Sequence, residues 1–267
     1  MHESEFLAEQ PSTSSRRAFL NRTAATGAGL ALAATLPAGA QAATREAKRA
    51  QSNRDTEILT AAEIAEALAV TTYTNIIDRA PFFADLEADD QGYLRAARQE
   101  EMSHYLLEQS ATGKPTPYTV FYYPKGMFSD TQTTLNVLVT LEDAFIAAYL
   151  VGVRNFSSSD LRVLAARIMG IESDHRTLAR VIGPNVPEKD GGPIETIVGF
   201  NGVPESVDPP NNNTYERTLG WTRIEQAVSA LTPFVSKDAA AKAGFDTSKS
   251  YTFEPFTPEL PSQLGAL

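Results

Sequence analysis

Residues 100–108, EEMSHYLLE, place a glutamate and a histidine three positions apart within an otherwise apolar helical pattern. Residues 171–180, IESDHRTLAR, repeat this Glu-x-x-His spacing. The chain holds three histidines, and the third is His2 near its beginning. Because residues three apart share one face of a helix, we expect both pairs, Glu101 with His104 and Glu172 with His175, to point into a core.

Four helical patterns surround these two motifs. The first begins with a capping box, in which Thr60 is the N-cap and Glu63 follows three residues later, and it runs to residue 79. The others cover residues 89–110, 129–155 and about 157–183. Short turns join the first helix to the second and the third to the fourth, whereas the long segment 113–128 separates the two pairs. The sequence therefore predicts an all-α fold, a four-helix bundle with one long crossover between helices 2 and 3.

The first and third helical patterns carry a further repeated phrase. Glu66 lies seven residues before Tyr73, and Glu142 lies seven residues before Tyr149. Both glutamates fall on the apolar stripe of their helix, so the chain contains a faint two-fold repeat of glutamate, tyrosine and Glu-x-x-His. Glu63 competes with Glu66 for the inward position, but only Glu66 has the tyrosine at this spacing.

The negative charge of four glutamates in one helical core has to be neutralised. Each buried carboxylate costs free energy, and neighbouring carboxylates repel one another or take up protons. Two divalent cations would cancel four negative charges, and two imidazoles would complete the ligands. Oxygen and imidazole donors suit two Fe or Mn ions, while zinc stays open. The alternative is a metal-free polar core.

The motifs, spacing and crossover resemble the ferritin-like superfamily. With the segment TYERTLGW and the later LTPF, the chain is similar to exported bacterial ferritin-like-domain proteins, which include desiccation-related proteins. The resemblance implies that Glu101 and Glu172 bridge two metal ions. The other metal ligands that it implies are Glu66, Glu142, His104 and His175.

The tyrosines and the remaining acids have competing interpretations. Tyr73 and Tyr149 are candidates for a redox role or for a hydrogen bond to a metal ligand, and the alternative is an ordinary core aromatic. Glu100 is expected in solvent or beside a ligand. Asp143 and Asp174 are expected at the surface or beside the ligands.

The N-terminus resembles a twin-arginine (Tat) signal. Arg16 and Arg17 precede an Ala/Gly-rich apolar stretch and small-residue cleavage options near residues 38–42. An N-terminal amphipathic or membrane helix is the alternative. We expect a signal at 1–42, a linker at 43–56, the bundle at 57–184 and an extension packed on the bundle at 185–267. The Tat translocation machinery would then be a partner, and the protein would be periplasmic or secreted.

Composition narrows the function further. The net charge of −10 argues against nucleic acid as a partner. The chain has no cysteine, which excludes metal sites with thiolate ligands. No internal apolar run is expected to span a membrane. The leading hypothesis is an oxidoreductase in which two Fe or Mn ions react with O2 or H2O2. The alternative is a non-catalytic metal-binding or stress-protective envelope protein, and homo-oligomer formation stays open.

Overall fold

The computed structural model of the protein describes residues 38–199, 202, 204–206 and 219–259. The chain divides into two compact units, residues 1–49 and 50–267. Of the first unit, only the helical residues 38–49 are described. The twin-arginine motif and residues 1–37 of the expected signal therefore lie outside the described residues.

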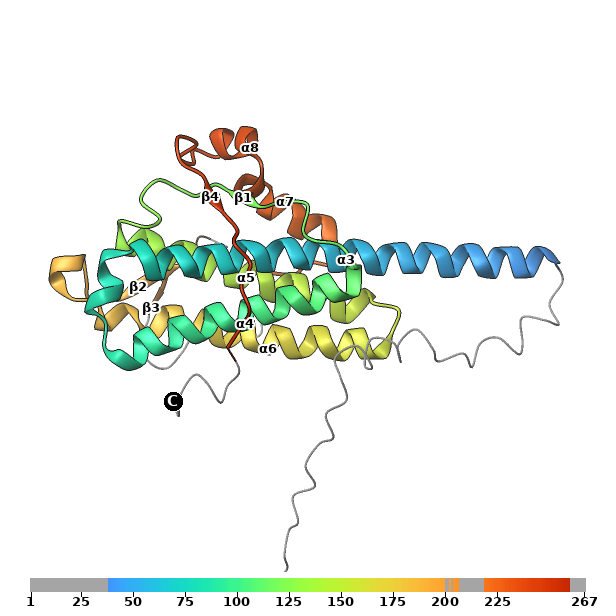
Figure 1. The fold of residues 1–267 in the computed structure, drawn as a ribbon, viewed down its shortest axis with the longest axis horizontal. Helices are drawn as coiled ribbons and strands as arrows, with labels where there is room; N and C mark the ends of the chain where they lie inside the picture. The colour runs from blue at the N-terminus through green and yellow to red at the C-terminus, as the bar shows by residue number, and fades with distance from the viewer. Residues whose placement is uncertain (1–37, 200–201, 203, 207–218, 260–267) are drawn as a thin grey trace, which may run out of the picture. The chain divides into compact units, whose positions relative to one another are not determined.

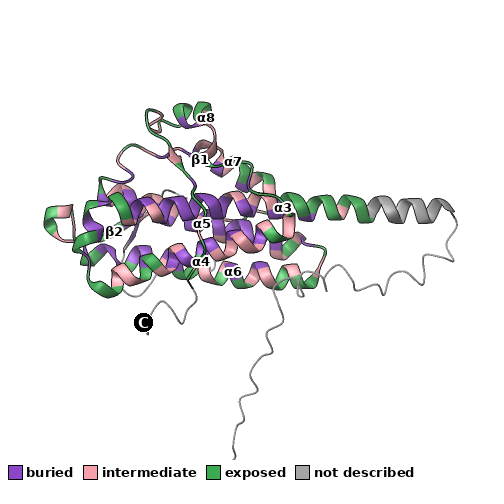
Figure 2. Ribbon diagram, in the orientation of Figure 1, coloured by how far each residue is buried: buried purple, intermediate pink, exposed green. Residues whose placement is uncertain are grey.

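Four long helices form the core of the second unit (Figure 1). They are α3 (Ala38–Arg79), of which residues 50–79 belong to this unit, α4 (Ala88–Thr112), α5 (Thr131–Asn155) and α6 (Ser159–Val181). Their buried faces, drawn in purple in Figure 2, lie inside the bundle, while their exposed residues face outward. The all-α prediction of a four-helix bundle with a C-terminal extension is confirmed.

Local signals set most helix ends. Asp130 caps α5 by accepting a hydrogen bond from the backbone N–H of Thr133, and Ser158 caps α6 by accepting from the N–H groups of Asp160 and Leu161. Gly113 ends α4 in the left-handed conformation, at φ 70°, where glycine has no Cβ penalty. These three ends agree with the predicted patterns to within about two residues.

The start of α3 differs from the prediction. The helix begins at Ala38, so Thr60 is an interior residue and not an N-cap. Residues 43–56 contain no glycine or proline and are rich in good helix formers, so the helix propagates through them. Near the end of this segment, Asp55 is buried and accepts a hydrogen bond from the backbone N–H of Ser157 at 3.0 Å.

The crossover between α4 and α5 pairs with the C-terminal extension. Strand β1 (Val120–Phe121) lies in the crossover and pairs antiparallel with β4 (Tyr251–Thr252). The backbone N–H of Tyr122 donates to the carbonyl of Phe234, and the N–H of Phe253 donates to the carbonyl of Thr119, both at 2.8 Å. These bonds fasten the extension to the crossover.

Short elements complete the fold. The extension contains helices α7 (Ile224–Val235), which includes Pro233, and α8 (Lys237–Lys242). Strands β2 (Thr196–Val198) and β3 (Pro204–Ser206) form a second antiparallel pair. The 3-10 turns are η1 (Pro81–Asp85), η2 (Gly183–Asn185) and η3 (Glu188–Asp190).

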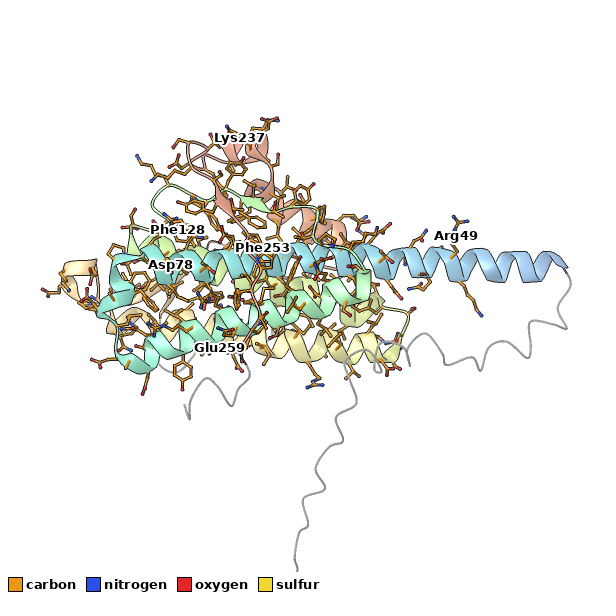
Figure 3. All side chains as sticks on the ribbon, in the orientation of Figure 1. Arg49, Asp78, Phe128, Lys237, Phe253 and Glu259 are labelled. Carbon is orange, nitrogen blue, oxygen red and sulfur yellow. The ribbon has the colours of Figure 1, made fainter. Side chains whose placement is uncertain are left out.

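The last described residues cross the bundle, as Figure 3 shows for Phe253 and Glu259. The ring of Phe253 is buried and packs edge-on against Tyr105 of α4, with ring centroids 4.7 Å apart. The backbone N–H of Glu259 donates to the side-chain oxygen of Gln99 at 3.0 Å. The extension thus packs on the bundle at several points along α4 and the crossover.

Helix α5 is apolar enough in length and composition to cross a membrane, which the sequence analysis did not expect. However, 56% of that apolar stretch is buried inside the fold, and its inner face carries Glu142. The core of the bundle accounts for the hydropathy of α5.

We predict that Phe253→Ala lowers the free energy of unfolding by about 3 kcal/mol, because it removes a buried aromatic side chain between the extension and α4. Urea denaturation of wild type and variant in the same metal state measures the change. Val228→Ala in α7 is the control, because that side chain is 51% exposed and should change stability by less than about 0.5 kcal/mol. An equally small effect of Phe253→Ala would contradict the described packing.

Candidate metal centre

Six chemically reactive side chains meet in the middle of the bundle. Each of the four helices contributes at least one, and the two Glu-x-x-His motifs bring their pairs from α4 and α6. Glu101, Glu142 and Glu172 are fully buried, Glu66 and His175 are almost so, and His104 is partly exposed. The full set is Glu66 of α3, Glu101 and His104 of α4, Glu142 of α5, and Glu172 and His175 of α6.

The six side chains form two overlapping groups. Within each group, one potential ligand atom per residue lies within 4.8 Å of the others. The first group, called here the Glu66 group, is Glu66, Glu101, His104 and Glu172; the second, called the Glu142 group, is Glu101, Glu142, Glu172 and His175. Glu101 and Glu172 belong to both, which is the arrangement expected of carboxylates placed between two ions.

The facing atoms lie close together without forming good hydrogen bonds. Nδ1 of His104 lies 3.2 Å from Glu172 Oε1 and 3.5 Å from Glu66 Oε2, and Nδ1 of His175 lies 3.0 Å from Glu101 Oε1. Both nitrogens and both oxygens of Glu101 and Glu172 are nevertheless buried without a partner in hydrogen-bonding geometry. Buried polar atoms are normally paired, so these converging atoms fit the coordination of cations.

Burial and mutual repulsion shape the protonation of the cluster. Burial raises the pKa of Glu66 and Glu142 well above its usual value, and the charge of Glu101 adds to both shifts. Burial alone would lower the pKa of His104 and His175, but neighbouring carboxylates raise both well above their usual value. Burial likewise opposes ionisation of Glu101, yet the two histidines lower its pKa. Without cations, the cluster therefore holds protons.

The two predicted tyrosines each contact a glutamate of the other half of the repeat. The hydroxyl of Tyr73 donates to Glu142 Oε1 at 2.7 Å, and the hydroxyl of Tyr149 contacts Glu66 Oε1. Both rings are buried, and Tyr73 also lies edge-on to His175, with ring centroids 5.7 Å apart. The tyrosines thus orient the two glutamates that occur in only one group each.

Glu108 is a further buried acid beside the cluster, and it was not among the predicted site residues. Its Oε1 lies 2.6 Å from the hydroxyl of Tyr149, which also contacts Glu66. One hydroxyl hydrogen serves only one of these contacts, so the other requires a protonated carboxyl. Burial raises the pKa of Glu108 well above its usual value, which suits that role. Its position four residues after His104 on the same helix face was the available signal.

Glu100 contacts a ligand candidate from the outside. Its Oε2 lies 2.9 Å from Nε2 of His175, and its side chain is 50% exposed. Of the two placements left open by the sequence, the structure shows the one beside the cluster. The repeat places Ile171 where a matching acid for His104 would be, so the two histidines differ in their outer contacts.

The other acids near the motifs are not among the six clustered side chains. Asp143 pairs with Arg176 of α6, whose guanidinium also lies 2.7 Å from the buried Glu205 of β3. Asp174 is exposed. Glu63 is buried and accepts a hydrogen bond from Thr112 at 3.1 Å, so it links α3 to the end of α4 and does not cap a helix.

Residues 54–182 match a protein family described as "Ferritin-like domain". The match covers the described bundle from the buried part of α3 to the end of α6 and includes all six clustered side chains. No curated protein matches this sequence. The finer resemblance to exported desiccation-related proteins stays a prediction.

We predict that the metal-free protein loses thermal stability as the pH rises from about 5 to about 8. Folded Glu66, Glu108 and Glu142 keep protons above the usual glutamate pKa of 4.5, and the histidines keep theirs above 6.5. The folded state therefore binds more protons than the unfolded state in this range, and raising the pH favours unfolding.

Melting temperatures across this pH range, measured after removal of metal by a chelator, test the sign. Glu108→Gln should flatten the dependence, because it removes one of the retained protons while keeping a polar group at the Tyr149 hydroxyl. A melting temperature that rises with pH would show that the cluster is ionised differently.

Proposed function

We propose that the protein binds two Fe or Mn ions in the bundle core and reacts with O2 or H2O2 as an exported oxidoreductase. The observation that carries this proposal is the buried set of four carboxylates and two imidazoles, whose facing atoms lack hydrogen-bonding partners. In a polar core without metal ions, these buried atoms would be expected to form hydrogen bonds with one another.

Charge and donor type both support two divalent cations. Four carboxylates balance the charge of two such ions, which removes the repulsion that adds to the effect of burial in raising the pKa of Glu66 and Glu142. All six donors are carboxylate oxygen or imidazole nitrogen, and the chain has no cysteine. Iron and manganese accept this donor set readily, whereas structural zinc favours closed tetrahedral sites.

The roles of the individual residues follow from the two groups. Glu101 and Glu172 would bridge the ions because they belong to both groups, and each histidine would bind one ion through Nδ1. Glu66 and Glu142 would each bind one ion, held in orientation by Tyr149 and Tyr73 respectively. The apolar bundle around them excludes bulk water.

Bound Fe or Mn would supply the one-electron chemistry that protein side chains lack. The chain contributes geometry, apolar surroundings and proton-bearing groups at Tyr149 and Glu108. The expected signal at residues 1–42 would export the folded, metal-loaded protein through the Tat machinery.

We predict that Glu101→Gln abolishes the binding of two ions per chain and, with it, oxidation of added Fe(II). The change keeps the size of the side chain but removes a charge shared by both groups. Elemental analysis gives the metal content, and the absorbance of Fe(III) after addition of Fe(II) gives the activity. Asp174→Asn is the control, because it removes an exposed carboxylate on α6.

Two outcomes would count against the proposal. Wild-type protein that takes up neither Fe(II) nor Mn(II) would reject the metal centre itself. Wild-type protein that holds two ions but oxidises nothing with O2 or H2O2 would favour the non-catalytic, protective function.

We further predict that Glu100→Gln weakens one of the two binding steps by about 10- to 100-fold, which is the usual cost of losing a carboxylate behind a metal-binding histidine. Glu100 contacts Nε2 of His175, and the repeat places Ile171 at the equivalent position for His104. Calorimetric titration with Mn(II) resolves the two steps. An equal loss of Mn(II) affinity in both steps would contradict the inference that Glu100 supports only one of the two histidines.

A further inference from the structure

A small cavity lies at one end of the bundle. Its volume is about 20 Å³, and aliphatic and aromatic side chains of α3, α5 and α6 form most of its walls, together with Ile224 of α7. Most of these side chains belong to a small hydrophobic cluster, whereas Ala65 and Phe145 belong to the main core. Glu108 and Tyr149 are the polar residues among the described residues that line it.

The cavity adjoins the Glu66 group through Tyr149. The Tyr149 ring lines the cavity, and its hydroxyl contacts Glu66 Oε1. Glu108 lines the same space and contacts the same hydroxyl at 2.6 Å. Only one tyrosine side chain therefore separates the cavity from a proposed metal ligand.

The volume of the cavity admits one small molecule, because a single water needs about 10 to 15 Å³ measured in this way. The polarity of its lining then selects among small molecules. A buried water makes about three hydrogen bonds, and hydrogen peroxide has as many polar atoms to satisfy.

The lining offers little for such a polar occupant. The Tyr149 hydroxyl and Glu108 Oε1 contact one another, and Glu108 Oε2 is the buried lining atom without a hydrogen bond among the described residues. Dioxygen needs no hydrogen bonds, and apolar cavities of protein interiors stay dry and take up apolar gases such as xenon.

We propose that this cavity receives dioxygen and delivers it past Tyr149 to the Glu66 group, so that O2 is the oxidant and H2O2 does not use this path. The inference rests on the proposed function and names its oxidant. It also makes the two groups unequal, because the cavity touches the side of the site that contains Glu66.

The tight walls make the proposal testable by single substitutions. A Cβ added at Gly152 would lie 2.8 Å from the Phe156 ring and 3.3 Å from Ala165 Cβ, so little free space remains there. Ala165 lines the cavity, and Ala165→Val would fill it. Leu164→Ala would enlarge it. Ala166→Val makes the same chemical change one residue along α6, at a position that does not line the cavity.

The first measurement is xenon binding to the metal-free protein by 129Xe NMR, which needs no activity. Wild type should bind xenon, Leu164→Ala should bind it more tightly, and Ala165→Val should lose it, while Ala166→Val behaves as wild type. Absence of xenon binding in both wild type and Leu164→Ala would overturn the inference. The Leu164→Ala variant tests the inference even if Ala165→Val fails to fold.

The second measurement is Fe(II) oxidation as a function of O2 concentration, and separately with H2O2 under anaerobic conditions. Ala165→Val should show a several-fold higher KM for O2, with the metal content and the H2O2-driven rate unchanged. An unchanged KM for O2, or an equal loss with both oxidants, would overturn the inference while two ions per chain still upheld the metal centre. Absence of bound metal in wild type would instead reject the proposed function.

Discussion

Four carboxylates packed into the interior of one helical bundle are the constraint on which the rest of this structure depends. Each of them lies on an otherwise apolar helix face, and three are fully buried. In a low-dielectric interior such a set must take up protons, pair with cations or come apart. The raised pKa of Glu66 and Glu142 corresponds to the first outcome, and the convergence of two imidazoles on the same carboxylates makes the second possible.

The two-fold repeat explains the symmetry of the cluster, and three departures from it explain its inequality. Tyr73 and Tyr149 each orient a glutamate from the other half. Glu108 stands behind Tyr149, whereas the repeat places the buried Ala179 at the equivalent position. Glu100 stands behind His175, and the apolar cavity adjoins only Tyr149 of the two tyrosines. Glu108, Tyr149 and the apolar cavity thus lie on the side of the cluster that contains Glu66, while Glu100 contacts His175 on the other side.

The regions outside the helices hold this arrangement together. The crossover and the C-terminal extension pair through β1 and β4, and Phe253 fills a gap beside α4. In the segment that follows α6, Glu205 of β3 pairs with Arg176 and Arg180 of α6. This segment therefore contacts the helix that carries two of the clustered residues. The extension is therefore part of the packing that positions the site.

Much of the fold and all six clustered residues could be predicted from the sequence, because helical periodicity determines which residues share a face. Glu101 and His104 must point the same way wherever their helix lies, and the spacing of Glu66 from Tyr73 matches that of Glu142 from Tyr149. The predicted helix boundaries near Gly113, Asp130 and Ser158 also agree with the structure to within about two residues. The predicted start at Thr60 was wrong, because helix propensity and packing of Asp55 against Ser157 outweighed a local capping motif.

Only the tertiary structure decided which acids meet which partners. Glu63, Glu100 and Glu108 each lie within four residues of a clustered side chain along the sequence, yet one contacts Thr112, one contacts His175 and one contacts Tyr149. The cavity beside Tyr149 likewise arises from side chains of five helices that together span the chain from residue 58 to residue 224. Periodicity specifies the inward face of each helix, whereas hydrogen-bond partners and empty space depend on how those faces are packed against one another.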